Sequence, residues 1–452
     1  MGKYFGTDGI RRKADKFTPD FMEGVAVGLK HYADEIGVES PKVVIGGDTR
    51  ESTEWILRDF EKALESVGME YANVGVLPTP GINYAFYDIN YDFAIDVTAS
   101  HNPYTDNGIK VFERGDEYGV KLSRAGVEAI ENSLDDINYT EAAGGEEVEN
   151  IHEEAVSLYL KHLRDYVDKI GPAEMAREGV DFSGMRIGLD CANGATSVTA
   201  RRIFEELGAE VTVINDNAEY GTGINRGCGS THLEALQLLV KEGRLDFGAA
   251  FDGDGDRCLM IDHTGTVVDG DEMLMIISEW LGLSEIATTV MANQGLFNWA
   301  AGKGVDLAIT DVGDANVFAR MREEGILLGG EQSGHIILPG EPMGDGVLTA
   351  LVMTKIISMT HQSLHDLASG MEKLPQIIHN FPATAEEKKR LAECDDIIAE
   401  YNQKVESAGG RMLVRPSGTE ELIRITIWGK DAEEIEKIAK ELEEALCQKL
   451  KD

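Results

Sequence analysis

The sequence predicts an α/β protein built from several domains. Short apolar runs typical of buried strands alternate with longer segments whose apolar residues recur at helical spacing. Glycine-rich turns separate these segments, and the alternation starts afresh after an acidic stretch near residue 150. Near the carboxyl end the order of strands and helices changes. We therefore expect several α/β units followed by a smaller α+β unit.

The first unit is defined by two strands and the helix between them. Residues 42–46 (KVVIG) and 93–97 (FAIDV) read as strands, and residues 52–67 have helical apolar spacing. Residues 141–153 (EAAGGEEVENIHE) are acidic and lose any period, so we expect a linker there.

The second unit repeats the β-α-β-α-β order. Its expected segments are strands at 185–189, 210–214 and 247–251 and helices near 200–207 and 233–242. A tight loop rich in Gly and Asp follows its last strand directly.

The third and fourth units complete the chain. In the third we expect strands at 288–291 and 307–310 and helices at 272–281, 296–301 and 317–324. In the fourth we expect strands at 376–380, 411–415 and 422–428 and helices at 386–407 and 432–449. The expected domains are 1–152, 153–256, 257–372 and 373–452.

Composition limits the classes of function. The 452 residues are 42% hydrophobic and 27% charged, as expected for a folded, soluble protein. The formal net charge of −39 argues against nucleic acid as a partner, because DNA or RNA phosphates would be repelled. No apolar run is long enough to span a bilayer, and no secretory signal is apparent. Five scattered cysteines without a CxxC pair fit reduced thiols, so we expect a cytoplasmic protein without a membrane partner.

The strongest candidate for a reactive side chain is Ser100. It lies in TASHNPYTDNGIK (98–110), directly after the expected strand at 93–97. Ligands bind at the carboxyl ends of strands in open α/β sheets, which gives this loop functional interest. A serine among Asn, Pro, Asp and Gly is by itself better explained as a turn or cap residue, and the other loops change that balance.

A second loop, DGDGDR (252–257), has carboxylates at alternate positions. Asp252, Asp254 and Asp256 can converge on one hard cation, and the intervening glycines allow unusual backbone angles. The spacing does not fit an EF-hand, because Arg257 and His263 stand where that motif needs Gly and Glu. Carboxylate oxygens favour Mg²⁺, and a surface turn remains the alternative.

Two further loops carry groups suited to binding a polar ligand. GGEQSGH (329–335) offers Glu331 and Ser333 as hydrogen-bonding groups and His335 as a group that titrates near neutral pH. RPSGTE (415–420) combines Arg415, hydroxyls and a glycine turn, with Arg424 nearby, as in a phosphate-binding nest. A salt-bridged hairpin is the alternative for the second loop. An anionic ligand would need such local clusters of basic residues in this acidic chain.

Taken together, five stretches resemble the α-D-phosphohexomutases. FGTDGIR (5–11), TASHNP (98–103), DGDGDR, GGEQSGH and RPSGTE occur in the family's order and spacing over nearly the whole chain. The resemblance implies four domains around a central cleft: three related α/β units with mixed sheets and a smaller C-terminal α+β domain. Gln332 and the TDGIR start look most like the members that act on glucosamine phosphate.

The resemblance also implies a role for each matching residue. Ser100 would carry a phosphoryl group and complete the Mg²⁺ site of Asp252, Asp254 and Asp256. Glu331 and Ser333 would contact sugar hydroxyls, with His335 beside them. The groups near the reacting phosphoryl would be Arg11, His101, Lys110 and Arg257, with Lys110 a candidate for proton transfer. The loop for the non-reacting phosphate would comprise Arg415, Ser417, Gly418, Thr419 and Arg424.

The implied activity is the interconversion of glucosamine 6-phosphate and glucosamine 1-phosphate. Mg²⁺ and a hexose 1,6-bisphosphate, as activator and intermediate, would be required, in a monomer or homodimer. Four residues depart from the family's usual pattern: Arg12, Leu233, Ala315 and Glu421. They leave open a mutase of broad mannose and glucose specificity, and more remotely a non-catalytic sugar-phosphate-binding protein.

Overall fold

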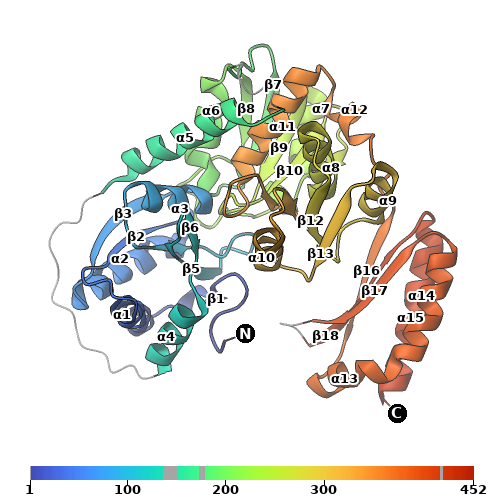
Figure 1. Cartoon of the computed structure of the whole chain (residues 1–452), viewed down its shortest axis with the longest axis horizontal. Helices are drawn as coiled ribbons and strands as arrows, with labels where there is room; N and C mark the ends of the chain where they lie inside the picture. Colours follow the sequence, from blue (N-terminus) through green and yellow to red (C-terminus); the bar gives the residue numbers. More distant parts are fainter. Residues whose placement is uncertain (1, 136–149, 173–178, 418–420, 452) are drawn as a thin grey trace. The chain divides into compact units, whose positions relative to one another are not determined.

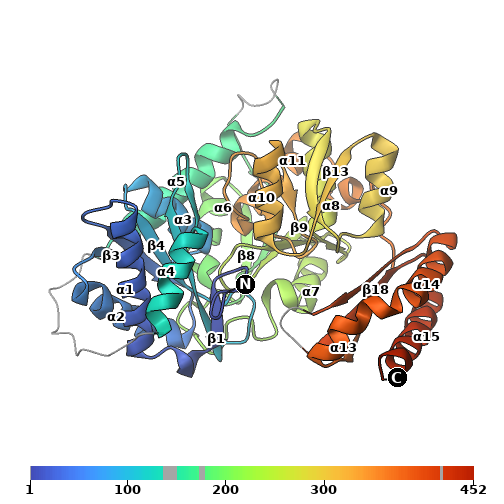
Figure 2. The ribbon, with the colours of Figure 1, turned by 60° about the horizontal axis from the view of Figure 1, so that its bottom comes forward.

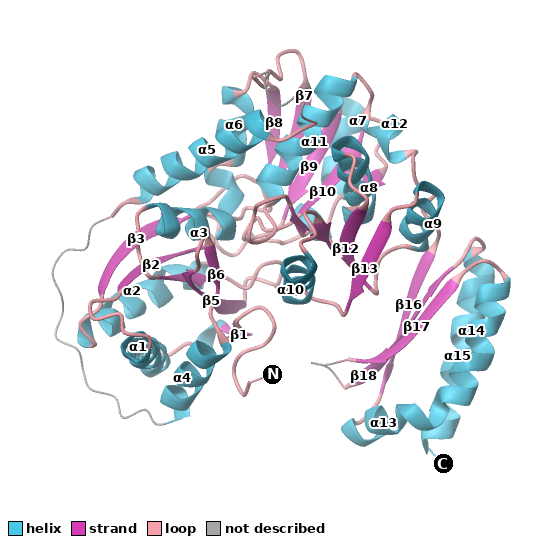
Figure 3. Cartoon of the chain, in the orientation of Figure 1, coloured by secondary structure: helices cyan, strands magenta, loops and turns pink. Residues whose placement is uncertain are grey.

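A computed structural model describes residues 2–135, 150–172, 179–417 and 421–451. The chain divides into two compact units, Met1–Val290 with Leu307–Ser369, and Met291–Asp306 with Gly370–Asp452. The described residues form four β-sheets, and helices lie next to each of them (Figure 1, Figure 3). The predicted α/β class is confirmed. Among these residues, no helix has both the length and the apolar character needed to cross a lipid bilayer.

The first sheet has the order β1-β5-β4-β2-β3, with β6 paired to β5. Its strands are β1 (Ile10–Lys13), β2 (Lys42–Gly47), β3 (Glu70–Val76), β4 (Phe93–Val97), β5 (Asp106–Arg114) and β6 (Gly119–Lys121). Its helices are α1 (Pro19–Glu35), α2 (Glu51–Ser66), α3 (Thr79–Asp88) and α4 (Arg124–Asp135), with a 3₁₀ turn η1 (Ala14–Lys16). β2 runs parallel to β3 and β4, whereas β5 runs antiparallel to its neighbours, so the sheet is mixed.

Burial explains this arrangement. Every residue of β4 is buried, because helices cover both faces of the sheet. Side chains of α1, α2 and α4 share one core with Val43, Ile45 and Ile95. On the other side of the sheet, α3 packs with α5 (His152–Lys169) (Figure 1). The loops after β2 and β4 consequently emerge at the same edge.

The second sheet has the order β11-β10-β9-β7-β8. Its strands are β7 (Arg186–Asp190), β8 (Glu210–Ile214), β9 (Phe247–Phe251), β10 (Cys258–Asp262) and β11 (Val267–Val268). The helical elements nearby are α5 (His152–Lys169), η2 (Ala195–Val198), α6 (Ala200–Glu206), η3 (Gly229–Thr231) and α7 (Glu234–Gly243). Because β10 and β11 join the antiparallel side of this sheet, it extends beyond the expected division between residues 256 and 257.

The third sheet is short and has the order β13-β12-β14-β15. Its strands are β12 (Glu285–Thr289), β13 (Asp306–Thr310), β14 (Gly329–Gly330) and β15 (Ile336–Ile337). The helices of this part of the first unit are α8 (Gly270–Leu281), α10 (Asp314–Glu324), α11 (Gly346–Thr360) and α12 (Leu364–Ala368). Asp269 begins α8 with a capping box to Glu272.

The second compact unit contains the three-stranded antiparallel sheet β16-β18-β17. Its elements are α9 (Gln294–Lys303), β16 (Gln376–Pro382), α13 (Ala385–Arg390), η4 (Leu391–Cys394), α14 (Asp395–Ser407), β17 (Arg411–Pro416), β18 (Leu422–Trp428) and α15 (Ala432–Lys451). Helices α14 and α15 lie side by side on the sheet (Figure 1, Figure 2), and Ile423, Ile425 and Leu442 belong to their shared core.

Several expectations about single elements need correction. The helix expected at 386–407 is interrupted, because Thr384 caps a short α13 and η4 turns Leu391 and Cys394 into the core. The strand expected at 288–291 is β12, which begins at Glu285. In the expected linker, residues 136–149 lie outside the described residues, and His152 already begins α5.

Candidate active site

Ser100 lies just beyond the buried strand β4, in a sharply turned loop. Its backbone is left-handed, with φ of 52°, and its side chain is completely buried. The hydroxyl donates to Oδ2 of Asp252 across 2.8 Å, although the two residues are far apart in sequence. Its amide donates to the Thr98 hydroxyl at 2.9 Å, which fixes the turn. The serine of the first loop therefore meets the carboxylates of the second.

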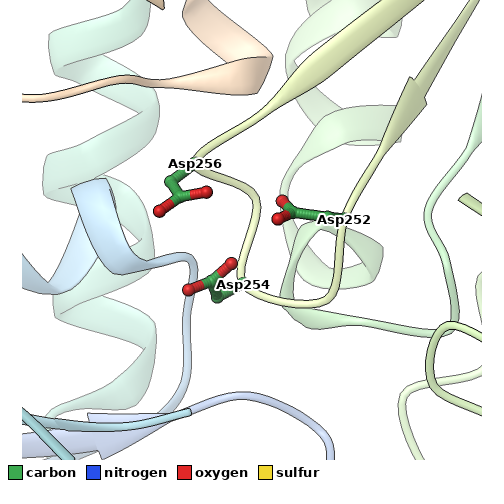
Figure 4. Close-up of side chains that lie close together, drawn as sticks. All are labelled: Asp252, Asp254 and Asp256. Carbon is green, nitrogen blue, oxygen red and sulfur yellow. The ribbon is translucent and has the colours of Figure 1, made fainter. Parts of the chain in front are cut away.

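Asp252, Asp254 and Asp256 are carried by the short loop that joins β9 to β10 (Figure 4). All three are buried, and each offers an oxygen within 4.8 Å of those of the other two. Glycine is required between them: a Cβ on Gly253 would lie 2.6 Å from the Ser100 carbonyl oxygen, and Gly255 has φ of 73°. Close approach of two backbones thus brings the serine and the carboxylates together.

The three carboxylates have the character of a cation site. Among the described residues, no hydrogen-bond donor reaches the buried Oδ1 atoms of Asp254 and Asp256. Burial, with repulsion from its two neighbours, raises the pKa of Asp252 well above its usual value. A divalent cation would satisfy these oxygens and relieve the repulsion, so the residues present fit a hard metal ion.

Lys110 approaches the same carboxylates from β5. Its Nζ lies 2.8 Å from Asp254 Oδ2, 3.0 Å from Asp256 Oδ2 and 3.6 Å from Asp8 Oδ2. Burial alone would lower the pKa of this amine, but the surrounding carboxylates raise it well above its usual value. Lys110 is therefore an ammonium in this arrangement, able to give a proton rather than take one.

A second group of polar side chains surrounds the Ser100 hydroxyl. Arg257 Nη1 donates to His101 Nδ1 at 2.9 Å. His101 Nδ1 in turn lies 3.3 Å from the Ser100 hydroxyl. Burial, together with the charges of Arg257 and Arg11, lowers the pKa of His101 to about 3, so the ring is neutral. Arg11 forms an ion pair with Asp8. The guanidinium of Arg257 is thus placed beside the candidate nucleophile.

The third loop joins β14 to β15 and reaches the carboxylates through His335. Nε2 of His335 accepts from the Gly344 amide at 2.9 Å, which leaves the proton on Nδ1, 3.7 Å from Asp256 Oδ2. Glu331 is half-buried and accepts from the Gly313 amide, and Ser333 is exposed. The loops carrying Ser100, the three aspartates and His335 therefore meet within the first compact unit.

Comparison with known families supports this picture. Models described as phosphoglucomutase/phosphomannomutase, alpha/beta/alpha domains I, II and III, match residues 2–141, 164–265 and 269–374. The model of the C-terminal domain of the same family matches residues 380–445. The chain belongs to the phosphoglucomutase/phosphomannomutase family. The resemblance derived from the five sequence stretches is confirmed, together with the four-domain α/β fold.

Similar proteins resemble the chain over its full length. A phosphoglucosamine mutase of Caldicellulosiruptor bescii is 41% identical, with 98% of each chain covered. One of Acetivibrio thermocellus is 39% identical, with 100% of each covered. A solved phosphoglucomutase/phosphomannomutase family protein of Burkholderia thailandensis matches with a TM-score of 0.75 at 20% identity, covering 98% of this chain and 97% of its own. This last likeness concerns the fold alone.

The fourth loop of this family member belongs to the second compact unit. Arg415 and Arg424 are direct partners on the adjacent strands β17 and β18. The Ser417 amide donates to the Leu422 carbonyl at 2.9 Å, and Lys388 donates to the Ser417 carbonyl at 2.7 Å. Gly418 and Thr419, also expected in this loop, lie outside the described residues. Two arginines and a lysine therefore gather around this hairpin.

Some polar residues at the first-unit site were missed by the sequence analysis. Asp8 pairs with Lys110, Arg11 and Lys121, although it stands inside the FGTDGIR stretch that was already noted. The Thr79 hydroxyl lies 2.5 Å from Asp96 Oδ2 and 3.1 Å from Asp254 Oδ2. Asp96 was detectable as the one charged residue in the apolar strand FAIDV. Nothing near Thr79 in the sequence indicates its role.

Proposed function

We propose that this chain is a phosphosugar mutase that interconverts glucosamine 6-phosphate and glucosamine 1-phosphate. The observation that carries the proposal is the Ser100 hydroxyl held 2.8 Å from a carboxylate of a buried aspartate triad. The phosphoglucosamine mutases at about 40% identity over nearly the whole chain support the choice of sugar.

In the proposed reaction, phosphorylated Ser100 transfers its phosphoryl group to the 1-hydroxyl of glucosamine 6-phosphate. The oxygen–phosphorus bond at Ser100 breaks, a new one forms at O1, and the sugar becomes a 1,6-bisphosphate. After the bisphosphate intermediate reorients in the site, its 6-phosphoryl group is transferred to Ser100 and glucosamine 1-phosphate leaves. Atoms balance, because the enzyme begins and ends with one phosphoryl group.

Asp252, Asp254 and Asp256 would hold Mg²⁺, completed by the phosphorylated Ser100. Mg²⁺ bound there would supply positive charge to the oxygens of the transferring group, which would stabilise a loose phosphoryl-transfer transition state. Arg257, which reaches the neutral His101 beside Ser100, adds a fixed positive charge at the same place. These residues supply positioning and electrostatic stabilisation.

The proton of the attacking hydroxyl passes between substrate and protein. We assign Lys110 to this exchange, because its surrounding carboxylates keep it an ammonium. It protonates the departing Ser100 or sugar oxygen, and the amine that this leaves takes up the proton of the attacking hydroxyl, so the ammonium is restored. Arg11 joins it as a second cation, and both are held by Asp8.

The sugar and its second phosphate are assigned to the other loops. Glu331, Ser333 and His335 would receive the sugar hydroxyls and the 2-amino group, for which a carboxylate is a suitable partner. Arg415, Ser417, Gly418, Thr419 and Arg424 would hold the phosphate that is not reacting. One cluster of donors can serve both orientations of the bisphosphate, because both of its ends are phosphate monoesters.

We also propose the cellular setting and the domain limits. The five cysteines are free thiols, four of them buried, which supports a reducing compartment such as the cytoplasm. A monomer or homodimer with Mg²⁺ and a hexose 1,6-bisphosphate as activator is the form we propose. The domains are 1–152, 153–268, 269–372 and 373–452, with the second limit placed after β11 because that strand belongs to the second sheet.

The test compares glucosamine, glucose and mannose phosphates side by side, with Mg²⁺ and the matching bisphosphate. We expect kcat/KM for glucosamine phosphate to exceed the others by about 10²-fold, roughly 3 kcal/mol of discrimination. Equal values would replace the amino-sugar assignment by a broad hexose mutase. Ser100→Ala should lose nearly all turnover and the mass increase of a phosphoryl group. Turnover that survives this substitution would remove the phosphoserine mechanism.

A further inference from the structure

The Arg50 side chain holds the loop that carries Ser100 from behind. It is completely buried, and its two terminal nitrogens donate to backbone carbonyl oxygens of that loop. The acceptors are the carbonyls of Ser100 (2.8 Å), Asn102 (2.9 Å), Pro103 (2.6 Å) and Asp106 (3.1 Å). Nε donates to Asp48 at 2.9 Å. A guanidinium has five N–H groups, so every one of them has an acceptor here.

The sheet explains how Arg50 reaches this loop. Gly47 and Val97 are paired residues at the ends of the parallel strands β2 and β4, so the segments that follow them start side by side. Asp48 accepts from the Arg50 amide at 3.0 Å and from the Thr98 hydroxyl at 2.7 Å. The ion pair is therefore tied to both segments and cannot shift without moving the turn at Ser100.

The turn needs such support, because Ser100 is a non-glycine residue with φ of 52°. Left-handed backbone is unfavourable for residues with a Cβ, and it persists where surrounding contacts determine it. Two of the four carbonyls are held a second time. Asn225 Nδ2 donates to the carbonyls of Ser100 at 2.8 Å and Asn102 at 3.2 Å. Arg50 and Asn225 thus donate hydrogen bonds to the same part of the turn.

We propose that Arg50 is a positioning residue for phosphoryl transfer, which sets the left-handed turn that aims the Ser100 hydroxyl at Asp252; this inference rests on the proposed mutase function. Arg50 does not touch the reacting atoms and acts through the loop backbone. Lysine cannot replace it, because a single ammonium has three N–H groups and lacks the planar fork that reaches four carbonyls. Its loss should slow the transfer step and leave sugar-phosphate binding, assigned to other loops, nearly unchanged.

A cavity of about 730 Å³ lies beside this arrangement. Arg50 and Asp48 belong to its lining, as do the surface carboxylates Glu51, Glu54 and Glu219, which favour entry of a cation. Truncation of Arg50 to alanine would open the space of the lost side chain toward this cavity. Free guanidinium could then occupy that space and donate to the vacated carbonyls.

The experiment measures phosphorylation of Ser100 by glucosamine 1,6-bisphosphate in a single turnover, followed by intact-protein mass, together with steady-state kcat and KM. For Arg50→Ala we expect the transfer rate and kcat to fall by about 10²-fold with KM nearly constant, the cost of a reactive group misplaced by about 1 Å. Millimolar guanidinium chloride should raise the reduced transfer rate of Arg50→Ala about tenfold, whereas sodium chloride of equal ionic strength should leave it unchanged. Arg50→Lys should lose activity similarly.

Arg58→Ala is the matched control. Arg58 lines the same cavity from α2, but its side chain is 59% exposed and pairs with Glu54. This variant should keep the wild-type rate and show no response to guanidinium. Asn225→Ala, which removes the second grip, should slow the same step more mildly and supplies a result if Arg50→Ala does not fold.

Four outcomes are decisive. Wild-type transfer rates in both Arg50 variants would overturn the inference. So would a folded Arg50→Ala protein that is slow but unresponsive to guanidinium, or losses that appear in KM alone. A wild-type chain that never acquires the phosphoryl group would instead overturn the proposed function, and the inference with it.

Discussion

The stability of this protein should depend on pH through the buried carboxyl group of Asp345. This buried carboxyl caps α11, accepting from the Leu348 amide at 2.8 Å, and the Tyr159 hydroxyl donates to it at 2.9 Å. Burial raises its pKa from 3.8 to about 7, against the opposing effect of these two donors. The perturbation is Asp345→Asn, which keeps the size and an acceptor oxygen but removes the titration.

The direction in which the free energy of unfolding changes with pH follows from proton binding. Between the unfolded pKa of 3.8 and the folded pKa of about 7, folded Asp345 holds a proton that the unfolded chain has lost. The free energy of unfolding therefore falls as pH rises through this window and levels off above it. Each pH unit is worth about 1.4 kcal/mol, so the window of about 3 units removes about 4 kcal/mol, an order-of-magnitude figure.

The assay is urea-induced unfolding of wild type and Asp345→Asn at several values between about pH 5 and about pH 8. The advantage of wild type over the variant should shrink steadily with rising pH. Tyr159→Phe removes a donor to the carboxylate and so raises the pKa of folded Asp345 further. In this variant the free energy of unfolding should continue to fall up to a higher pH. A stability difference between wild type and Asp345→Asn that stays constant over this range would refute the reasoning.

Two further substitutions test contacts that support the site and its framework. Thr79→Val removes the hydroxyl 3.1 Å from Asp254 Oδ2 and should weaken Mn²⁺ binding about tenfold, as titrated by electron paramagnetic resonance. Thr79→Ser keeps the hydroxyl and should bind Mn²⁺ like the wild type. Equal Mn²⁺ affinities of Thr79→Val and the wild type would exclude a supporting role for this hydroxyl. Lys355→Met leaves three carbonyls at the end of α5 without their ammonium donor and should cost about 3 kcal/mol in thermal unfolding. Lys161→Met, at an exposed position of α5, is the control. An equal loss of stability in Lys355→Met and Lys161→Met would contradict this estimate.

The sequence indicated the site wherever one loop contained several reactive residues in a row. Asp252, Asp254 and Asp256 stand together after an apolar strand, and glycines reveal the turn that brings their oxygens close. Ser100 was detectable for the same reason, because β4 is an unbroken apolar run apart from Asp96. Alternation and local turn chemistry act over a few residues, and both loops depend mainly on them.

Residues whose partners are distant in sequence could not be found in this way. Arg50 follows β2 and reads as an ordinary charged loop residue, since its four carbonyl acceptors lie in the loop after a different strand. Lys121 likewise acquires meaning only when folding brings Asp8 and Asp314 to it. Helix α11 escaped detection for another reason. Its residues from Gly346 to Ile357 are all buried, so no polar face produces a helical period.

The charge balance at the site changes how this acidic chain would accommodate a phosphate. The sequence suggested that an anionic ligand requires a locally basic cluster, yet each cation in the first compact unit's site lies beside a carboxylate. The cations are Arg11, Lys110, Lys121 and Arg257, and the carboxylates are Asp8, Asp252, Asp254, Asp256 and Asp314. The four cations are matched by the carboxylates even if Asp252, whose pKa is raised, is left out, so the site has no net attraction for phosphate. A divalent cation on the aspartates would reverse that balance, so metal binding and phosphate binding would strengthen one another.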